Sequence, residues 1–151
     1  MLINIQLTQR GQQSQKFGRS KGGFSTNVHA TTDFLGCPTR FILTGGNESD
    51  YLQAVPLIEN QQDDYVIADK GYDSQAIVDA IKSKGAEPVI PARSHRKASR
   101  DYDRYICKER NAIERMFNKI KQFRRIATRY DKLAIAYLSF LHVAAIAVWL
   151  R

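Results

Sequence analysis

The chain has 151 residues, a formal net charge of +8 and 43% hydrophobic residues. These values are typical of one globular domain and exclude an intrinsically disordered chain. The two cysteines, Cys37 and Cys107, lack metal-site spacing and are too few for a secreted disulfide framework, so we expect a reduced, cytoplasmic setting.

The first half of the chain predicts a hairpin followed by a helix. The stretches 24–33 and 39–46 are rich in β-branched residues and flank a Gly-Cys-Pro turn, which indicates two antiparallel strands. Residues 49–60 space their apolar side chains as a helix does, with Ser49 or Asp50 as the N-cap.

The middle of the chain predicts a strand–helix–strand unit. We expect a strand at 64–69, a helix at 75–85 and a strand at 86–92, with the two strands parallel. Ligands bind at the carboxyl ends of such strands. Asp69 lies at one of these ends, so it is either a site residue or the acid of a turn or helix N-cap.

The excess positive charge lies in one segment. Residues 93–129 contain 13 Lys/Arg and 4 Asp/Glu, whereas the rest of the chain contains 10 and 11. A localised basic segment favours nucleic acid as a partner, and we expect Arg124, Arg125 and Arg129 to contact its phosphates. The alternative is a solvated helix face.

A long helical pattern runs from about residue 103 to residue 130. At 100° per residue, Arg110, Glu114 and Lys121 share one face. The adjoining apolar stripe consists of Ile113, Phe117 and Ile120. Taken alone, the polar face is explained by an i,i+4 Arg–Glu pair and a solvated lysine.

The last pattern, at 133–150, is nearly all apolar and just long enough to span a membrane. Tyr137, Ser139 and His142 interrupt it, so we expect a buried core helix with His142 inside the core.

Several motifs stand in a fixed order along the chain: GRSKGGFSTNVHA, RFILTGG, ADKGYDS, VIPARSHRK and the long helix RNAIERMFNKIKQFRRIATRYDKL, with Glu114 following Asp69 by 45 residues. From about Gly18 to the C-terminus, this set resembles bacterial insertion-sequence transposases of the DDE type. Their helix signature also has a tyrosine seven residues before the glutamate, a position that Cys107 occupies here.

The resemblance implies an α/β, ribonuclease H-like fold with a mixed sheet and flanking helices. It also implies three carboxylates that bind two divalent ions, Mg²⁺ or Mn²⁺, to cut and join DNA strands. By this match, Asp69 is the second acid and Glu114 the third, and both are metal ligands. Arg110 and Lys121 would contact DNA phosphates or orient the site.

The first acid of the family has no counterpart in this sequence. Residues 1–16 contain no Asp or Glu, and Asp33 follows the first readable strand and does not match. We therefore expect 1–16 to be a non-matching lead and 17–151 to be the downstream part of the catalytic domain, without its central strand and inactive alone.

The expected partners are the DNA of insertion-sequence ends and targets, an upstream-frame product that carries the first aspartate, and further copies in an oligomeric complex. No membrane is expected. The alternative is a non-catalytic, basic DNA-binding remnant, which would need no divalent ion.

Overall fold

The computed structural model describes residues 2–5, 16, 18–20, 23–94 and 102–150. The strands are β1 (Leu2–Ile5), β2 (Gly18–Ser20), β3 (Gly23–Thr32), β4 (Pro38–Gly45), β5 (Tyr65–Ala68) and β6 (Glu87–Val89). The α-helices are α1 (Ala54–Ile58), α2 (Gln75–Ser83), α3 (Arg104–Lys108), α4 (Asn111–Lys121), α5 (Arg124–Ala127) and α6 (Ala134–Trp149), and the 3-10 turns are η2 (Asp50–Gln53) and η3 (Lys70–Tyr72).

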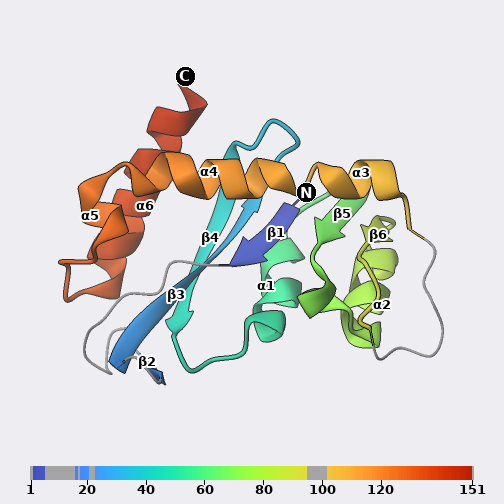
Figure 1. Cartoon of the computed structure of the whole chain (residues 1–151), viewed down its shortest axis with the longest axis horizontal. Coiled ribbons are helices and arrows are strands. Elements are labelled where there is room, and N and C mark those ends of the chain that lie inside the picture. The colour runs from blue at the N-terminus through green and yellow to red at the C-terminus, as the bar shows by residue number, and fades with distance from the viewer. Residues whose placement is uncertain (1, 6–15, 17, 21–22, 95–101, 151) are drawn as a thin grey trace.

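Strand β1 lies at the centre of the sheet. It pairs antiparallel with β3 on one side and parallel with β5 on the other, while β4 and β6 lie beyond these neighbours (Figure 1). The expectation of an absent central strand is therefore not confirmed. The four residues of β1 form too short a pattern to predict a strand from the sequence. Their strand conformation is defined by the pairing with β3 and β5.

The two predicted strand units are confirmed. Strands β3 and β4 form the antiparallel hairpin, with Gly36 at φ 82° in its turn. Strands β5 and β6 are parallel and are connected through α2, which is followed by Gly85 at φ 79°. Glycine suits both positions because it adopts positive φ without steric cost.

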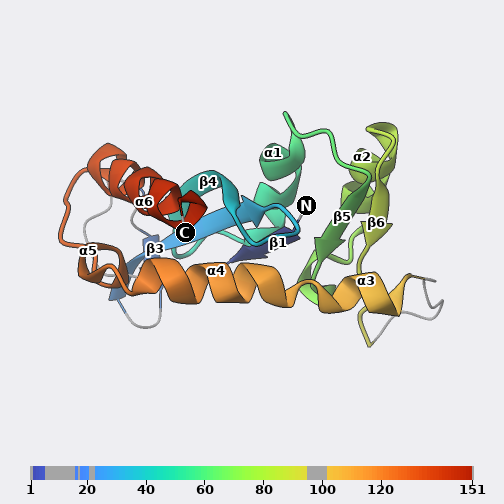
Figure 2. The same ribbon diagram turned by 90° about the horizontal axis from the view of Figure 1, so that it is seen from above.

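Helices cover both faces of the sheet (Figure 2). Ile67 of β5 packs into the cluster that contains α4, α5 and α6, whereas its neighbours Val66 and Ala68 pack into the cluster that contains α1 and α2. This alternation is the period-2 geometry of a strand with both faces buried. It fixes the carboxyl end of β5 between the two helical layers.

The long helical pattern is divided into three helices, so the prediction of one continuous helix is wrong. A turn at Glu109 and Arg110 separates α3 from α4, although the two lie almost in line (Figure 1). The predicted apolar stripe of Ile113, Phe117 and Ile120 is confirmed, since all three side chains are buried. It holds α4 across the sheet.

Helix α6 is buried on one side only. Tyr137 and Leu141 are fully buried, whereas Val143 and Ile146 on the other side are 61% and 58% exposed. His142 is exposed and contacts the edge of Phe41, so the prediction of a core histidine is wrong. The helix packs against β4, α4 and α5, which cover only one stripe. In the described parts of the chain, no helix combines the length and apolarity needed to span a membrane.

Candidate active site

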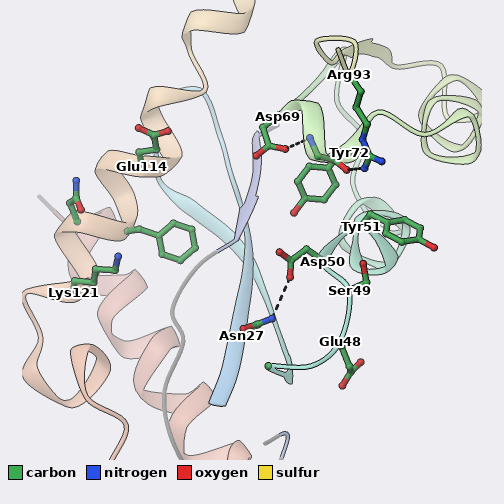
Figure 3. Close-up of a pocket in the computed structure, with 14 residues that line it drawn as sticks. Asn27, Glu48, Ser49, Asp50, Tyr51, Asp69, Tyr72, Arg93, Glu114 and Lys121 are labelled. Carbon is green, nitrogen blue, oxygen red and sulfur yellow. Dashed lines mark hydrogen bonds between the residues drawn. The ribbon is translucent and has the colours of Figure 1, made fainter. Parts of the chain in front are cut away.

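A cavity of about 820 Å³ opens where the end of β5, the turn after β4 and helix α4 meet. Four of its lining residues are acids: Glu48 lies in the turn after β4, Asp50 begins η2, Asp69 follows β5, and Glu114 lies on α4. Figure 3 shows Asp69 and Glu114 on opposite walls, with Asp50 below Asp69. Folding therefore brings Asp69 and Glu114, the two predicted acids, to one pocket.

Asp69 holds a tight turn as well as facing the pocket. It is the N-cap of η3, and its Oδ1 accepts a hydrogen bond from the Gly71 backbone N–H at 2.6 Å. A Cβ added to Gly71 would lie 2.8 Å from that same oxygen. A side chain at position 71 would displace the Asp69 carboxylate, so the turn favours glycine. The N-cap interpretation of Asp69 is confirmed, and its role as a site residue stays a prediction.

Arg93 holds the loop that carries Asp69. Its Nε donates to the Lys70 carbonyl at 3.1 Å and its Nη2 to the Gly71 carbonyl, while its backbone N–H donates to Asp73 Oδ2 at 2.9 Å. Arg93 also lines the cavity. Sequence analysis counted it only as part of the basic segment, because these partners lie 20 to 23 residues upstream.

Helix α4 contributes Glu114 and Lys121, which both line the cavity together with Asn118. Arg110 is not among the lining residues. It lies at the turn before α4, where the predicted continuous helix is interrupted. Glu114 and Lys121 therefore face the cavity from the same helix, and the place of Arg110 on that face stays a prediction.

Asp50 is a pocket residue that sequence analysis did not predict as part of the site. Burial and the charge of Asp69 raise the pKa of its carboxyl group, against a hydrogen bond from Asn27 Nδ2 to its Oδ1 at 3.3 Å. Asp50 and Asp69 line the same cavity. In the sequence, Asp50 was only a candidate N-cap of the helix at 49–60, and nothing there indicated that it would share a pocket with Asp69.

Tyr72 closes the pocket on the side of these two acids. The residue is 3% exposed, and its hydroxyl has no hydrogen-bond partner among the described residues. Burial and the charges of Asp50 and Asp69 raise the pKa of the phenol, so the hydroxyl keeps its proton. In Figure 3 the hydroxyl is directed toward Asp50.

The three arginines expected to contact DNA have different environments. Arg124 is exposed at the start of α5. Arg125 is bound to Asp131 at 2.8 Å and lies 4.0 Å from the centre of the Phe140 ring. Arg129 is buried, and its guanidinium donates to the Thr26 hydroxyl and to the carbonyls of residues 131 and 132. This geometry favours a structural role for Arg129.

The donor chemistry of the pocket suits Mg²⁺ or Mn²⁺, which prefer carboxylate oxygens. In the described residues, no group of three or more His, Cys, Asp or Glu side chains is close enough to hold a metal ion. Magnesium, however, is commonly bound by one or two carboxylates, with water and substrate phosphate completing its shell. Asp69 and Glu114 could therefore each supply part of the ligands of such an ion.

Comparison with known proteins places the chain in a family. The model of the family described as "Transposase DDE domain" matches residues 4–150, and the match begins within the segment 1–16. The chain is 36% identical over 132 residues to a transposase named for insertion sequence element IS6501 of Brucella ovis, covering 84% of this chain and 99% of that protein. It is 32% identical over 148 residues to a transposase named for element IS402 of Burkholderia cepacia, covering 85% and 68%. No solved structure matches. This chain belongs to the DDE transposase family of insertion sequences, whose domain implies a ribonuclease H-like fold.

Proposed function

We propose that the protein acts in DNA transposition, in a site that cuts and joins DNA strands by metal-dependent phosphoryl transfer. One observation carries the proposal: Asp69 and Glu114, 45 residues apart in sequence, line the same pocket at the carboxyl end of β5. Ligands bind at such strand ends in α/β sheets.

In the proposed site, Asp69 and Glu114 each hold a divalent ion. When bound, the two ions supply Lewis-acid stabilisation to the attacking and leaving oxygens of the phosphoryl group. The chain positions these ligands through the Gly71 turn and through Arg93, which fixes two carbonyls of the same loop. Lys121, on the Glu114 side, offers a cation to a DNA phosphate.

DNA binding is proposed for the basic segment around α4 and α5. Arg110, Lys121, Arg124 and Arg125 lie at or near the ends of these helices, and Lys121 also lines the pocket. Contacts of this kind recognise phosphates rather than base sequence. We leave Arg129 out of the DNA interface because its guanidinium is buried and hydrogen-bonded within the chain.

The proposal requires an aspartate beside Asp69 that this sequence lacks. Strand β1 reads Leu-Ile-Asn-Ile, and Ile3 pairs with Ala68. Asn4 is the next residue of β1 after this pair, just as Asp69 is the next residue after β5. We propose that full activity needs an aspartate supplied by a second polypeptide, such as an upstream-frame product. The second candidate is a non-catalytic DNA-binding protein, which the missing acid favours.

A strand-transfer assay tests the proposal on duplex DNA that carries the ends of the insertion sequence, with Mg²⁺ or Mn²⁺. We expect the native chain to bind DNA without joining strands, and we expect Asn4→Asp to gain metal-dependent cleavage. In that background, Asp69→Asn or Glu114→Gln should abolish cleavage and leave DNA binding intact, because each removes a metal ligand and no phosphate contact.

Two results would contradict the assignment. Metal-dependent strand transfer by the native chain would show that no further aspartate is needed. Full activity of the Glu114→Gln variant in the Asn4→Asp background would remove Glu114 from the site.

A further inference from the structure

Asp50 faces the pocket from an element that the family signature does not include. It begins η2, directly after the turn that leaves β4, and lines the same cavity as Asp69. Asn27 of β3 donates a hydrogen bond to its Oδ1 at 3.3 Å, which orients the carboxylate. Within the described parts of the chain, no Lys or Arg side chain forms an ion pair with Asp50 or Asp69. Two carboxylates therefore face a cavity in which neither of the lining cations, Arg93 and Lys121, forms an ion pair with them.

The hydroxyl of Tyr72 is an independent sign that the pocket takes a polar occupant. It is buried, has no hydrogen-bond partner in the part of the chain that the structure describes, and is directed toward the Asp50 side of the pocket (Figure 3). A buried hydroxyl without a partner costs free energy unless a bound group satisfies it. A protonated phenol donates a hydrogen bond, so the missing partner is an oxygen atom.

We propose that Asp50 and Asp69 together bind one divalent cation, Mg²⁺ or Mn²⁺, and that Tyr72 donates a hydrogen bond to an oxygen of the ion's hydration shell. The inference rests on the proposed function, since it enlarges the ligand set of that same site. A hard divalent cation fits because it takes carboxylate oxygens and keeps several waters. A phosphate alone does not fit, because the two carboxylates would repel it.

The proposal changes what the Asp69 side of the site can do. Asp69 alone, with one oxygen held by the Gly71 backbone, would be a weak ligand. Asp50 adds a second carboxylate to the same wall, so an ion can be held there before DNA arrives. Glu114 lies on the opposite wall, on α4, and is not needed for this binding.

Manganese binding to the full chain without DNA tests the inference, with Mn²⁺ titrations followed by electron paramagnetic resonance. We expect one ion per chain, and we expect Asp50→Asn to weaken binding about tenfold or more. Tyr72→Phe should weaken it by a smaller factor, because it removes only a contact to the hydration shell.

Glu48→Gln is the matched control. Glu48 lines the same cavity and loses the same charge, but its Oε1 accepts a hydrogen bond from the Gly45 backbone N–H at 2.9 Å. We expect native affinity for this variant. Equal losses for Glu48→Gln and Asp50→Asn would mean diffuse attraction and would overturn the site, as would native affinity of Asp50→Asn.

A measurement on the native chain removes any dependence on how the variants fold. Substoichiometric Mn²⁺ should broaden the amide NMR signals of Asp50 and Gly71 before those of Glu48 and Lys121. Broadening centred on Glu114 would overturn the proposal. Because DNA is absent, failure here leaves the strand-transfer result untouched, and failure of strand transfer leaves this result untouched.

Discussion

His29 shows at the residue scale how burial creates a pH dependence that sequence analysis does not predict. Its side chain is fully buried, with Nε2 2.6 Å from the Thr44 hydroxyl, and no described residue is a hydrogen-bond partner of Nδ1. Desolvation lowers its pKa to about 4, against a smaller opposing effect of Glu48. The folded state therefore holds the neutral ring.

The free energy of unfolding should consequently fall as the pH falls from 6.5 to 4. In this window the unfolded chain binds a proton at His29 that the folded chain rejects, so the stability present above pH 6.5 is lost toward pH 4, by at most roughly 3 kcal/mol. Urea unfolding of the native chain and of His29→Gln, at matched pH values, isolates this loss from that of the carboxylates. Identical pH profiles would contradict the assignment.

Arg129 and Arg124 belong to the same basic segment and should respond differently to mutation. Arg129→Met removes the buried hydrogen bonds to Thr26 and to two backbone carbonyls, so we expect a loss of about 2 kcal/mol in unfolding free energy and little change in DNA affinity. Arg124→Ala should leave stability unchanged and reduce the slope of log K against log salt by about one. An unchanged slope for Arg124→Ala would remove it from the DNA interface.

At the scale of elements, sequence patterns predicted the elements that are determined by interactions between residues close in sequence. The hairpin, the β5–α2–β6 unit and the apolar stripe of α4 follow from periodicity and turn residues, and the structure has all of them. Strand β1 did not follow, because its four residues become a strand only by pairing with distant neighbours. The continuous helix expected from 103 to 130 failed because periodicity continues through the turn at Glu109 and Arg110.

The residues of the candidate site also fall into those that the sequence predicted and those that it did not. Asp69, Glu114 and Lys121 were found through an ordered set of motifs, and the pocket contains all three. Asp50, Tyr72 and Arg93 were not found as site residues, because their roles depend on the meeting of β4, β5 and the segment after β6. Contacts between segments that are far apart in the sequence produce no pattern of residue spacing from which they could be predicted.

At the scale of the whole molecule, β1 joins the two halves of the sheet. The antiparallel strands β3 and β4 lie on one side of it and the parallel strands β5 and β6 on the other. Between β3 and β5, the described residues offer no other strand. We therefore expect the cooperativity of unfolding to depend on this four-residue strand.

Ile3→Pro tests this dependence through the backbone alone. Proline has no N–H and cannot take part fully in the ladders to Thr31 and Ala68, so it should separate β3 from β5. We expect the variant to bind the dye ANS, to lose near-ultraviolet circular dichroism and to unfold without a cooperative transition, because the strand edges and apolar faces on both sides become exposed. The control Ile3→Val keeps the N–H and should unfold like the native chain. If Ile3→Pro unfolds cooperatively at the native midpoint, β1 does not hold the sheet together.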